Sequence, residues 1–119
     1  MEIKVGDYVR TKNKGIKKIL DIGEYLGMTQ YLINENGDYI IDNSIIKSSP
    51  NIIDLIEEDD YVNGFKVSFV DEEPVMGKFV QCDYAVQYGS TNHYKFYEKD
   101  IKSIVTKQQF SQMEYKISG

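Results

Sequence analysis

Val5-Gly6-Asp7-Tyr8-Val9 and Glu58-Asp59-Asp60-Tyr61-Val62 are two stretches of one chain that resemble each other. Each Asp-Tyr-Val is preceded by an isoleucine at a similar distance, Ile3 in the first stretch and Ile56 in the second. Each is followed by a polar, turn-prone stretch and then by an apolar one. Internal self-similarity is typical of repeated structural units. The sequence therefore predicts two diverged copies of one strand-rich unit.

The ends of the two copies match as well. Asp42-Asn-Ser-Ile-Ile46-Lys-Ser48 corresponds to Asp100-Ile-Lys-Ser-Ile104-Val-Thr106. In both stretches an aspartate leads into an isoleucine-rich strand that ends at a hydroxyl residue. The chain is thus expected to divide into a first β repeat, residues 1–55, and a second β repeat, residues 56–119, with an extended tyrosine-rich hairpin.

Short helical turns are expected where each copy ends. Ser48 and Thr106 are residue types that cap helix N-termini, which places the turns at about 49–54 and 107–112. Elsewhere the alternation of apolar and polar residues predicts short strands. Asn36-Gly37, between apolar runs, is the strongest hairpin signal.

These patterns predict a mainly-β fold with short helical turns, built as two tandem SH3-like β-barrels or bent sheets. A copy of fewer than 60 residues is marginal alone, so a shared interface is expected. Exposed sheet edges also favour a homodimer or a higher oligomer.

Composition restricts the class of partner. The chain has 119 residues and a formal net charge of −5, which disfavours nucleic acid and anionic membranes as partners. Cys82 is the single cysteine, so no intramolecular disulfide can form. The sequence has no apolar signal segment and no run long enough to span a membrane. A cytoplasmic location in a bacterial host cell is expected.

No catalytic or metal motif stands out. A zinc site needs three or four ligands, and Cys82 with His93 supplies too few. A Cys–His nucleophile pair has no accompanying oxyanion motif, so we expect no enzyme and no cofactor. The carboxylate runs Glu57–Asp60 and Asp71–Glu73 are interpreted as solvated loops. The alternatives are a weak cation site or a patch for a basic partner.

One basic run stands against the acidic average, and it comprises Arg10, Lys12, Lys14, Lys17 and Lys18. A solubilising turn between two strands explains it most simply. The functional alternative is an anion or nucleotide contact, with Arg10 as the best donor because its planar fork suits phosphate.

The most unusual segment runs from Tyr84 to Tyr97, and it is where the extra length of the second copy is expected. Alternation places half of its rings in the core. The others, with the polar tip, could stack on a base or insert into a partner protein. The candidate binding residues are Arg10, Lys12, Lys14, Tyr84, Tyr88, Ser90, Thr91, Asn92, His93 and Tyr94.

Both copy junctions carry a resemblance. Ser49-Pro-Asn-Ile-Ile-Asp-Leu-Ile56 before Asp60-Tyr-Val-Asn-Gly64, and Asp100 to Phe110 before Glu114-Tyr-Lys-Ile117, resemble small phage and prophage proteins of low-GC Gram-positive bacteria. The resemblance covers about a third of the chain and carries no residue roles. It implies an accessory protein of the kind that disarms host defence.

Three functions follow as hypotheses. The first is a non-enzymatic phage accessory protein that binds a host defence protein, such as a CRISPR effector, or sequesters a nucleotide immune signal. The second is a nucleic-acid-associated SH3-like module, whose binding would fall steeply with salt. The third, an enzyme, requires a convergent acid–base pair that the sequence does not reveal.

Overall fold

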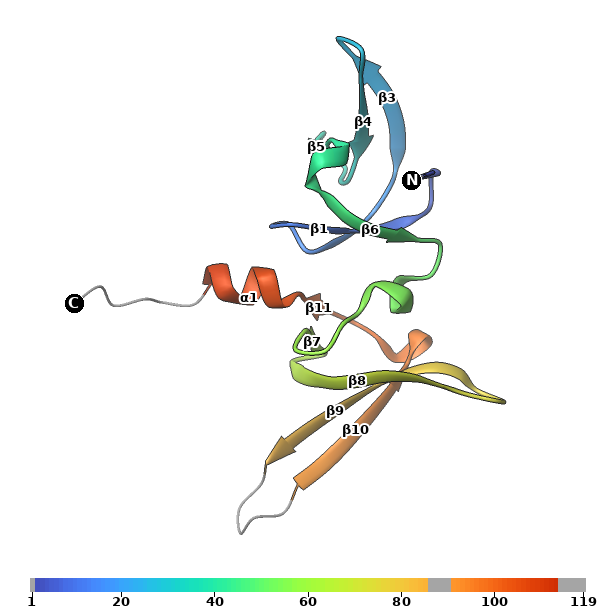
Figure 1. Cartoon of the computed structure of the whole chain (residues 1–119), viewed down its shortest axis with the longest axis vertical. Helices are drawn as coiled ribbons and strands as arrows, with labels where there is room; N and C mark the ends of the chain where they lie inside the picture. Colours follow the sequence, from blue (N-terminus) through green and yellow to red (C-terminus); the bar gives the residue numbers. More distant parts are fainter. Residues whose placement is uncertain (1, 86–90, 114–119) are drawn as a thin grey trace, which may run out of the picture. The chain divides into compact units, whose positions relative to one another are not determined.

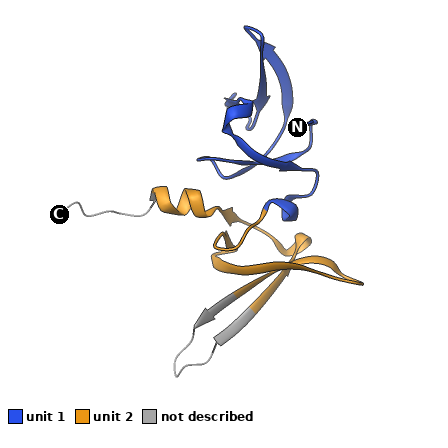
Figure 2. Cartoon of the chain, viewed as in Figure 1, with its two compact units in different colours: residues 1–55 blue, residues 56–119 orange. Residues whose placement is uncertain are grey.

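The computed structural model describes residues 2–85 and 91–113, with side chains for residues 2–82 and 94–112. The described part is mainly β, with one short α-helix (Figure 1). The chain divides into two compact units, Met1–Leu55 and Ile56–Gly119 (Figure 2). This boundary coincides with the one expected between the two copies. Each unit is described by itself.

Unit 1 contains two small antiparallel sheets that share one core. The first has the order β2-β1-β6 and the second has the order β3-β4-β5. The core is a cluster of buried apolar side chains, in which Val9 and Ile19 are fully enclosed. The elements are β1 (Tyr8–Thr11), β2 (Ile16–Lys18), β3 (Asp21–Tyr25), β4 (Met28–Leu32), β5 (Tyr39–Ile40), the 3₁₀ helix η1 (Asp42–Ser44), β6 (Ile45–Ser49) and the 3₁₀ helix η2 (Ile52–Leu55).

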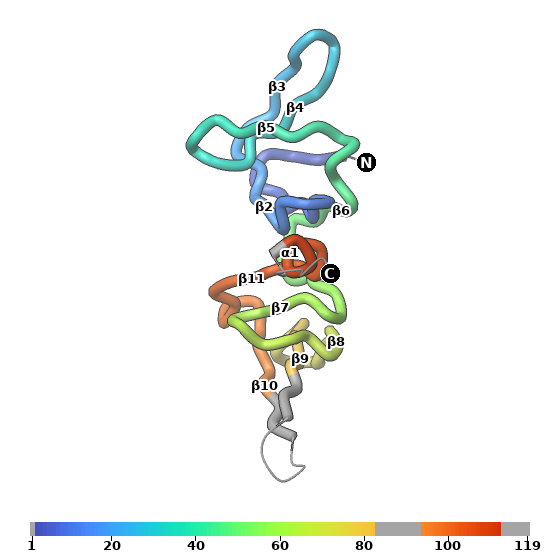
Figure 3. The backbone as a smooth tube through the Cα atoms, turned by 90° about the vertical axis from the view of Figure 1, so that its left-hand side faces the viewer, coloured from blue at the N-terminus to red at the C-terminus, as the bar shows by residue number. Residues whose placement is uncertain are grey.

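Unit 2 is one open antiparallel sheet with the strand order β10-β9-β8-β7-β11 (Figure 3). Val62, Val80 and Cys82 are fully buried in it. Its elements are β7 (Tyr61–Val62), β8 (Phe65–Glu73), β9 (Gly77–Ala85), β10 (Thr91–Tyr97), the 3₁₀ helix η4 (Glu98–Asp100), β11 (Ile104–Val105) and α1 (Lys107–Met113). The described strands close no barrel in either unit.

The Asp-Tyr-Val stretches occupy matching local frameworks. The Asp7 carboxylate accepts a hydrogen bond from the backbone N–H of Lys4 at 3.0 Å. The Asp60 carboxylate accepts one from the backbone N–H of Glu57 at 2.7 Å. In both cases the aspartate closes a turn onto the residue three positions earlier, which is a typical aspartate turn contact.

The residue before each of these aspartates also plays the same part. Gly6 has φ 95° and donates its N–H to the Ile19 carbonyl at 2.8 Å. Asp59 has φ 75° and donates its N–H to the Val67 carbonyl at 3.0 Å. Ile19 and Val67 are both essentially buried. These stretches therefore act as scaffold that fixes the first strand of each unit.

The two expected helical turns are present, with one change at the caps. Thr106 caps α1: its hydroxyl accepts from the Gln109 N–H at 3.2 Å, while the Gln109 side chain accepts from the Thr106 N–H at 3.0 Å. This is a reciprocal capping box. Ser48 does not cap η2, because β6 extends to Ser49. The Ser49 hydroxyl instead accepts from the Asn51 N–H at 3.1 Å.

The strands β9 and β10 form a long hairpin in unit 2. The strands β9 and β10 pair from Thr91 opposite Ala85 to Tyr97 opposite Phe79. In unit 1, by contrast, β4 and β5 pair at two positions only. This hairpin, which projects from unit 2 (Figure 1), is where the sequence predicts the added residues of the second copy.

Candidate functional site

The strands β8, β9 and β10 bring side chains from distant parts of the sequence onto one face of the unit 2 sheet. Tyr97 lies opposite Phe79, and Phe79 lies opposite Asp71. Residues that lie opposite each other on neighbouring strands project on the same side. We call this surface the acidic aromatic face, and its members are Phe69, Asp71, Glu73, Phe79, Lys95 and Tyr97.

Three rings form the centre of the acidic aromatic face. The ring of Phe79 is 6.3 Å from that of Phe69 and 6.2 Å from that of Tyr97, both edge-to-face. Phe79 is buried beneath them, whereas Phe69 keeps 42% of its surface exposed. Edge-to-face pairs at such distances are favourable. The Phe69 ring is therefore held in place by its contact with Phe79, and its exposed surface is available to a ligand.

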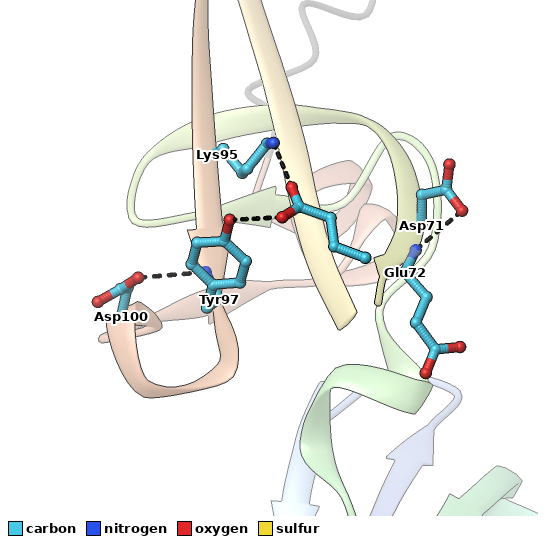
Figure 4. Close-up of polar contacts among 6 residues, drawn as sticks. Asp71, Glu72, Lys95, Tyr97 and Asp100 are labelled. Atoms are coloured by element: carbon cyan, nitrogen blue, oxygen red, sulfur yellow. Dashed lines mark hydrogen bonds and ion pairs between the residues drawn. The ribbon is translucent and has the colours of Figure 1, made fainter. Parts of the chain in front are cut away.

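A polar cluster that includes Lys95 and Tyr97 belongs to the same face (Figure 4). The Glu73 carboxylate accepts hydrogen bonds from the Lys95 ammonium and, at 3.1 Å, from the Tyr97 hydroxyl. The Lys95 ammonium also lies 4.5 Å from the centroid of the Phe79 ring. A lysine of the chain is thus held between a carboxylate and an aromatic ring, which is the arrangement of a cation–π site.

The electrostatics of this cluster favour the charged pair. The hydrogen bond from Lys95 lowers the pKa of Glu73, and the same bond raises the pKa of Lys95. Desolvation, followed by the hydrogen bond to Glu73, raises the pKa of Tyr97. All three shifts move away from neutrality. The cluster holds its protons in place rather than offering an acid or base poised for transfer near pH 7.

Replacing Lys95 with methionine is expected to raise the pKa of Glu73 toward its ordinary value. Because the pKa of Glu73 is lowered in the folded state, the stability that this carboxylate contributes is present above the ordinary glutamate value. It is lost as the pH falls through the lowered folded-state pKa. The carbon-13 shift of the Glu73 carboxyl, followed against pH, measures the change. An unchanged titration midpoint in Lys95→Met would contradict the assignment.

The opposite face of the same sheet carries a second set of rings. Tyr94 packs on Phe65 with ring centroids 4.4 Å apart, and Phe96 lies 6.2 Å from both. Tyr94 lies opposite the buried Cys82 and remains 37% exposed. This expected ligand residue is therefore part of the aromatic layer over the unit 2 core.

The basic residues expected to hold an anion are not brought together. Arg10 is fully buried in β1, and its guanidinium donates to the Leu55 carbonyl at 3.0 Å. It does not present its planar fork at the surface, as the anion site required. Lys12 and Lys14 are exposed in the turn that follows β1.

The remaining expected binding residues stay predictions. Tyr84 lies in β9, and Thr91, Asn92 and His93 lie in β10, but their side chains are outside the described part. Tyr88 and Ser90 fall outside the described residues altogether.

No metal centre is found among the side chains of residues 2–82 and 94–112, where no group of three histidine, cysteine or carboxylate side chains could hold an ion. Among these residues, no helix has the length and apolar character needed to cross a membrane. Unit 1 has a shallow pocket of about 310 Å³, lined by Gly27, Met28, Thr29, Ile41, Asp42 and Asn43.

No known protein family, curated protein or solved structure matches this chain.

Phe69, Phe79 and Lys95 were not predicted from the sequence as members of a site. Asp71–Glu73 was considered as a patch for a basic partner, and Tyr97 was noted among the rings of the second copy. The pairing register of β8 with β9 would have shown that these residues share one face of the sheet. This register shifts between Val67 and Phe69.

Proposed function

We propose that this chain is a non-enzymatic binding protein whose acidic aromatic face engages a basic segment of a partner protein. The observation that carries the proposal is the Lys95 side chain, held between the Glu73 carboxylate and the Phe79 ring. It is an internal example of the contact that a partner's lysine or arginine would make. Phe69 and Asp71 are an aromatic ring and a carboxylate of the same kinds, and both are exposed.

Charge supports a basic partner. Unit 2 carries more than half of the 19 acidic residues of the chain. Asp71, which shares a face of the sheet with Phe69, and Glu72, which is on the other face, are both exposed near the end of β8. A cation placed over an aromatic ring gains about 0.5–1 kcal/mol at exposed sites and more when it is desolvated. The combined field of the carboxylates also accelerates encounter with a basic surface.

We further propose that the two units are diverged copies of one small SH3-like unit. The strand β8 pairs with both β7 and β9, whereas in unit 1 this pairing is divided between β2 and β3. Each unit has a 3₁₀ helix before its last strand, and matching aspartate turns support the same equivalence. Small β units of this type commonly serve as binding modules.

The resemblance of the copy junctions to phage proteins suggests a biological setting. In this setting the partner is a host defence effector whose basic groove handles nucleic acid. The acidic aromatic face would bind in the basic groove of the effector and compete there with nucleic acid. Sequestration of a nucleotide immune signal is the alternative, and it would depend on exposed cations such as Lys12 and Lys14.

Replacing Phe69 with alanine is expected to weaken binding of a basic peptide about tenfold, because a stacked cation contact is lost. The probe is a short fluorescein-labelled peptide of alternating lysine and serine, measured by fluorescence anisotropy. Tyr39→Ala is the matched control, since Tyr39 is an exposed ring of unit 1. Equal affinity in Phe69→Ala and Tyr39→Ala would reject the face.

The same variants separate the two biological alternatives. Expression of the chain in a defended host should increase phage plating, and Phe69→Ala should abolish the increase while Tyr39→Ala preserves it. Calorimetry against cyclic and ADP-ribose-type nucleotides tests sequestration. Nucleotide binding that survives Phe69→Ala, without peptide binding, would replace the protein-partner proposal with the nucleotide one.

A further inference from the structure

Two asparagines of the chain are followed by glycine, Asn36 in unit 1 and Asn63 in unit 2. This pair is the one most prone to lose its side-chain amide spontaneously, because glycine has no Cβ to hinder the approach of its backbone nitrogen. Gly37 and Gly64 have nearly the same φ, 88° and 86°. A difference in reactivity between the two asparagines would therefore come from how each unit holds the side chain.

The side chain of Asn63 is held at both ends. Its oxygen accepts hydrogen bonds from the N–H groups of Lys102 and Ser103, at 2.7 and 3.1 Å. Its nitrogen donates to the Asp100 carbonyl at 2.9 Å. Loss of the amide requires the side-chain Cγ to reach the Gly64 nitrogen, and this movement would break these hydrogen bonds. The contacts that stabilise the turn therefore also oppose the reaction.

Asn36 is held differently. Both Asn36 and Gly37 are exposed, in the loop between β4 and β5. Among the described residues, the Asn36 side chain makes no hydrogen bond, whereas its backbone N–H is anchored by the Asn34 side-chain oxygen at 2.9 Å. The Gly37 N–H lies 3.4 Å from the Asn34 carbonyl, which is longer than the usual distance for such a bond. The attacking nitrogen and the side chain that it attacks are thus both weakly restrained.

We propose that Asn36 is a site of spontaneous self-modification and that the fold protects Asn63 from the same reaction. The Gly37 nitrogen loses its proton and attacks the Cγ of Asn36. The bond from Cγ to the amide nitrogen breaks, and ammonia leaves with the proton. Water then opens the resulting succinimide ring. Cleavage between the Gly37 nitrogen and Cγ gives aspartate, whereas cleavage between this nitrogen and the main-chain carbonyl carbon gives isoaspartate.

The isoaspartate product would alter the loop between β4 and β5. Its main chain runs through the former side chain and is longer by a methylene group. The Asn34 side-chain oxygen accepts from the N–H groups of Asn36 and Asp38, at 2.9 and 3.2 Å. The added methylene lies between these two donors, so both cannot keep their present positions. The freed carboxylate adds a negative charge, and it is the group that isoaspartate-specific carboxyl methyltransferases accept.

The test is incubation of the full chain at mildly alkaline pH, in its native state and in urea, followed by peptide mapping with mass spectrometry. In the native chain Asn63 should react at least about tenfold more slowly than Asn36, because its hydrogen bonds must break first. In urea the two rates should be similar. Methyl transfer from labelled S-adenosylmethionine by an isoaspartate-specific methyltransferase identifies the product, and Asn36→Gln should remove this label from the native chain.

Equal rates at the two asparagines in the native chain would overturn the proposal, and so would an Asn36 that stays intact while both react in urea. Asn36→Asp separates charge from chain length, because it carries the added charge on a main chain of normal length. The chain aged until Asn36 is converted should unfold at a lower urea concentration than Asn36→Asp. Equal unfolding midpoints would overturn the effect assigned to the longer main chain.

Discussion

Replacing Asp60 with alanine is expected to lower the free energy of unfolding by about 3 kcal/mol, which is the scale for removing charge-assisted hydrogen bonds to a buried group. Asp60 is fully buried. Its carboxylate accepts from the Glu57 N–H at 2.7 Å and from the Lys107 N–H at 2.9 Å. It therefore joins the turn before β7 to the first residue of α1. Alanine leaves both donors without this acceptor.

Urea unfolding followed by tyrosine fluorescence and circular dichroism measures the effect of Asp60→Ala. Asp7→Ala is the matched control, because Asp7 closes the equivalent turn of unit 1 but is only half-buried. We expect Asp7→Ala to cost about 1 kcal/mol, the usual value for a single hydrogen bond. Equal losses in the two variants would contradict the role assigned to Asp60.

The second large effect is expected at Asn63. This residue has φ 52° in the two-residue turn between β7 and β8. Its side-chain oxygen accepts from the N–H groups of Lys102 and Ser103, at 2.7 and 3.1 Å. Its side-chain nitrogen donates to the Asp100 carbonyl at 2.9 Å. Asn63 thus shapes the turn and holds the segment that leads into β11.

Asn63→Ala is expected to cost about 3 kcal/mol, combining left-handed strain with the lost hydrogen bonds. Asn63→Gly removes the same hydrogen bonds but tolerates the turn, so it should recover about 1 kcal/mol. The measurement is again equilibrium unfolding in urea. Wild-type stability in Asn63→Ala, or no recovery in Asn63→Gly, would show that the turn is not stabilised in this way.

Local signals explain which parts of the fold could be predicted. The turns closed by Asp7 and Asp60, and the cap that Thr106 forms on α1, each include a contact between residues three positions apart. Asn36-Gly37 also marks the β4–β5 hairpin, although its loop is longer than a tight turn and is organised by Asn34. The Asn34 side-chain oxygen accepts from the N–H groups of Asn36 and Asp38, at 2.9 and 3.2 Å.

Long-range register explains what could not be predicted. In β1 the residues Val9, Arg10 and Thr11 are all buried, so simple alternation fails there. The pairing of β1 with β6 shifts between Arg10 and Thr11. An arginine that alternation places at the surface is therefore enclosed. The anion site centred on Arg10 was inferred from residue type and spacing, which do not report burial.

The acidic aromatic face illustrates the same limit. Glu73, Phe79 and Lys95 come from three strands, and their proximity depends on the pairing of β8 with β9 and of β9 with β10. The sequence indicated that the second copy adds a tyrosine-rich hairpin. It did not indicate that Phe69 and Phe79 would complete a surface with Tyr97.

The most direct test of the proposed function is a nitrogen-15 NMR titration of the chain with the lysine–serine peptide. The proposal predicts that the shifted amides cluster on β8, β9 and β10, around Phe69, Asp71 and Phe79, and that Phe69→Ala suppresses them. Shifts centred on Lys12 and Lys14, or shifts that leave these strands unchanged, would contradict it.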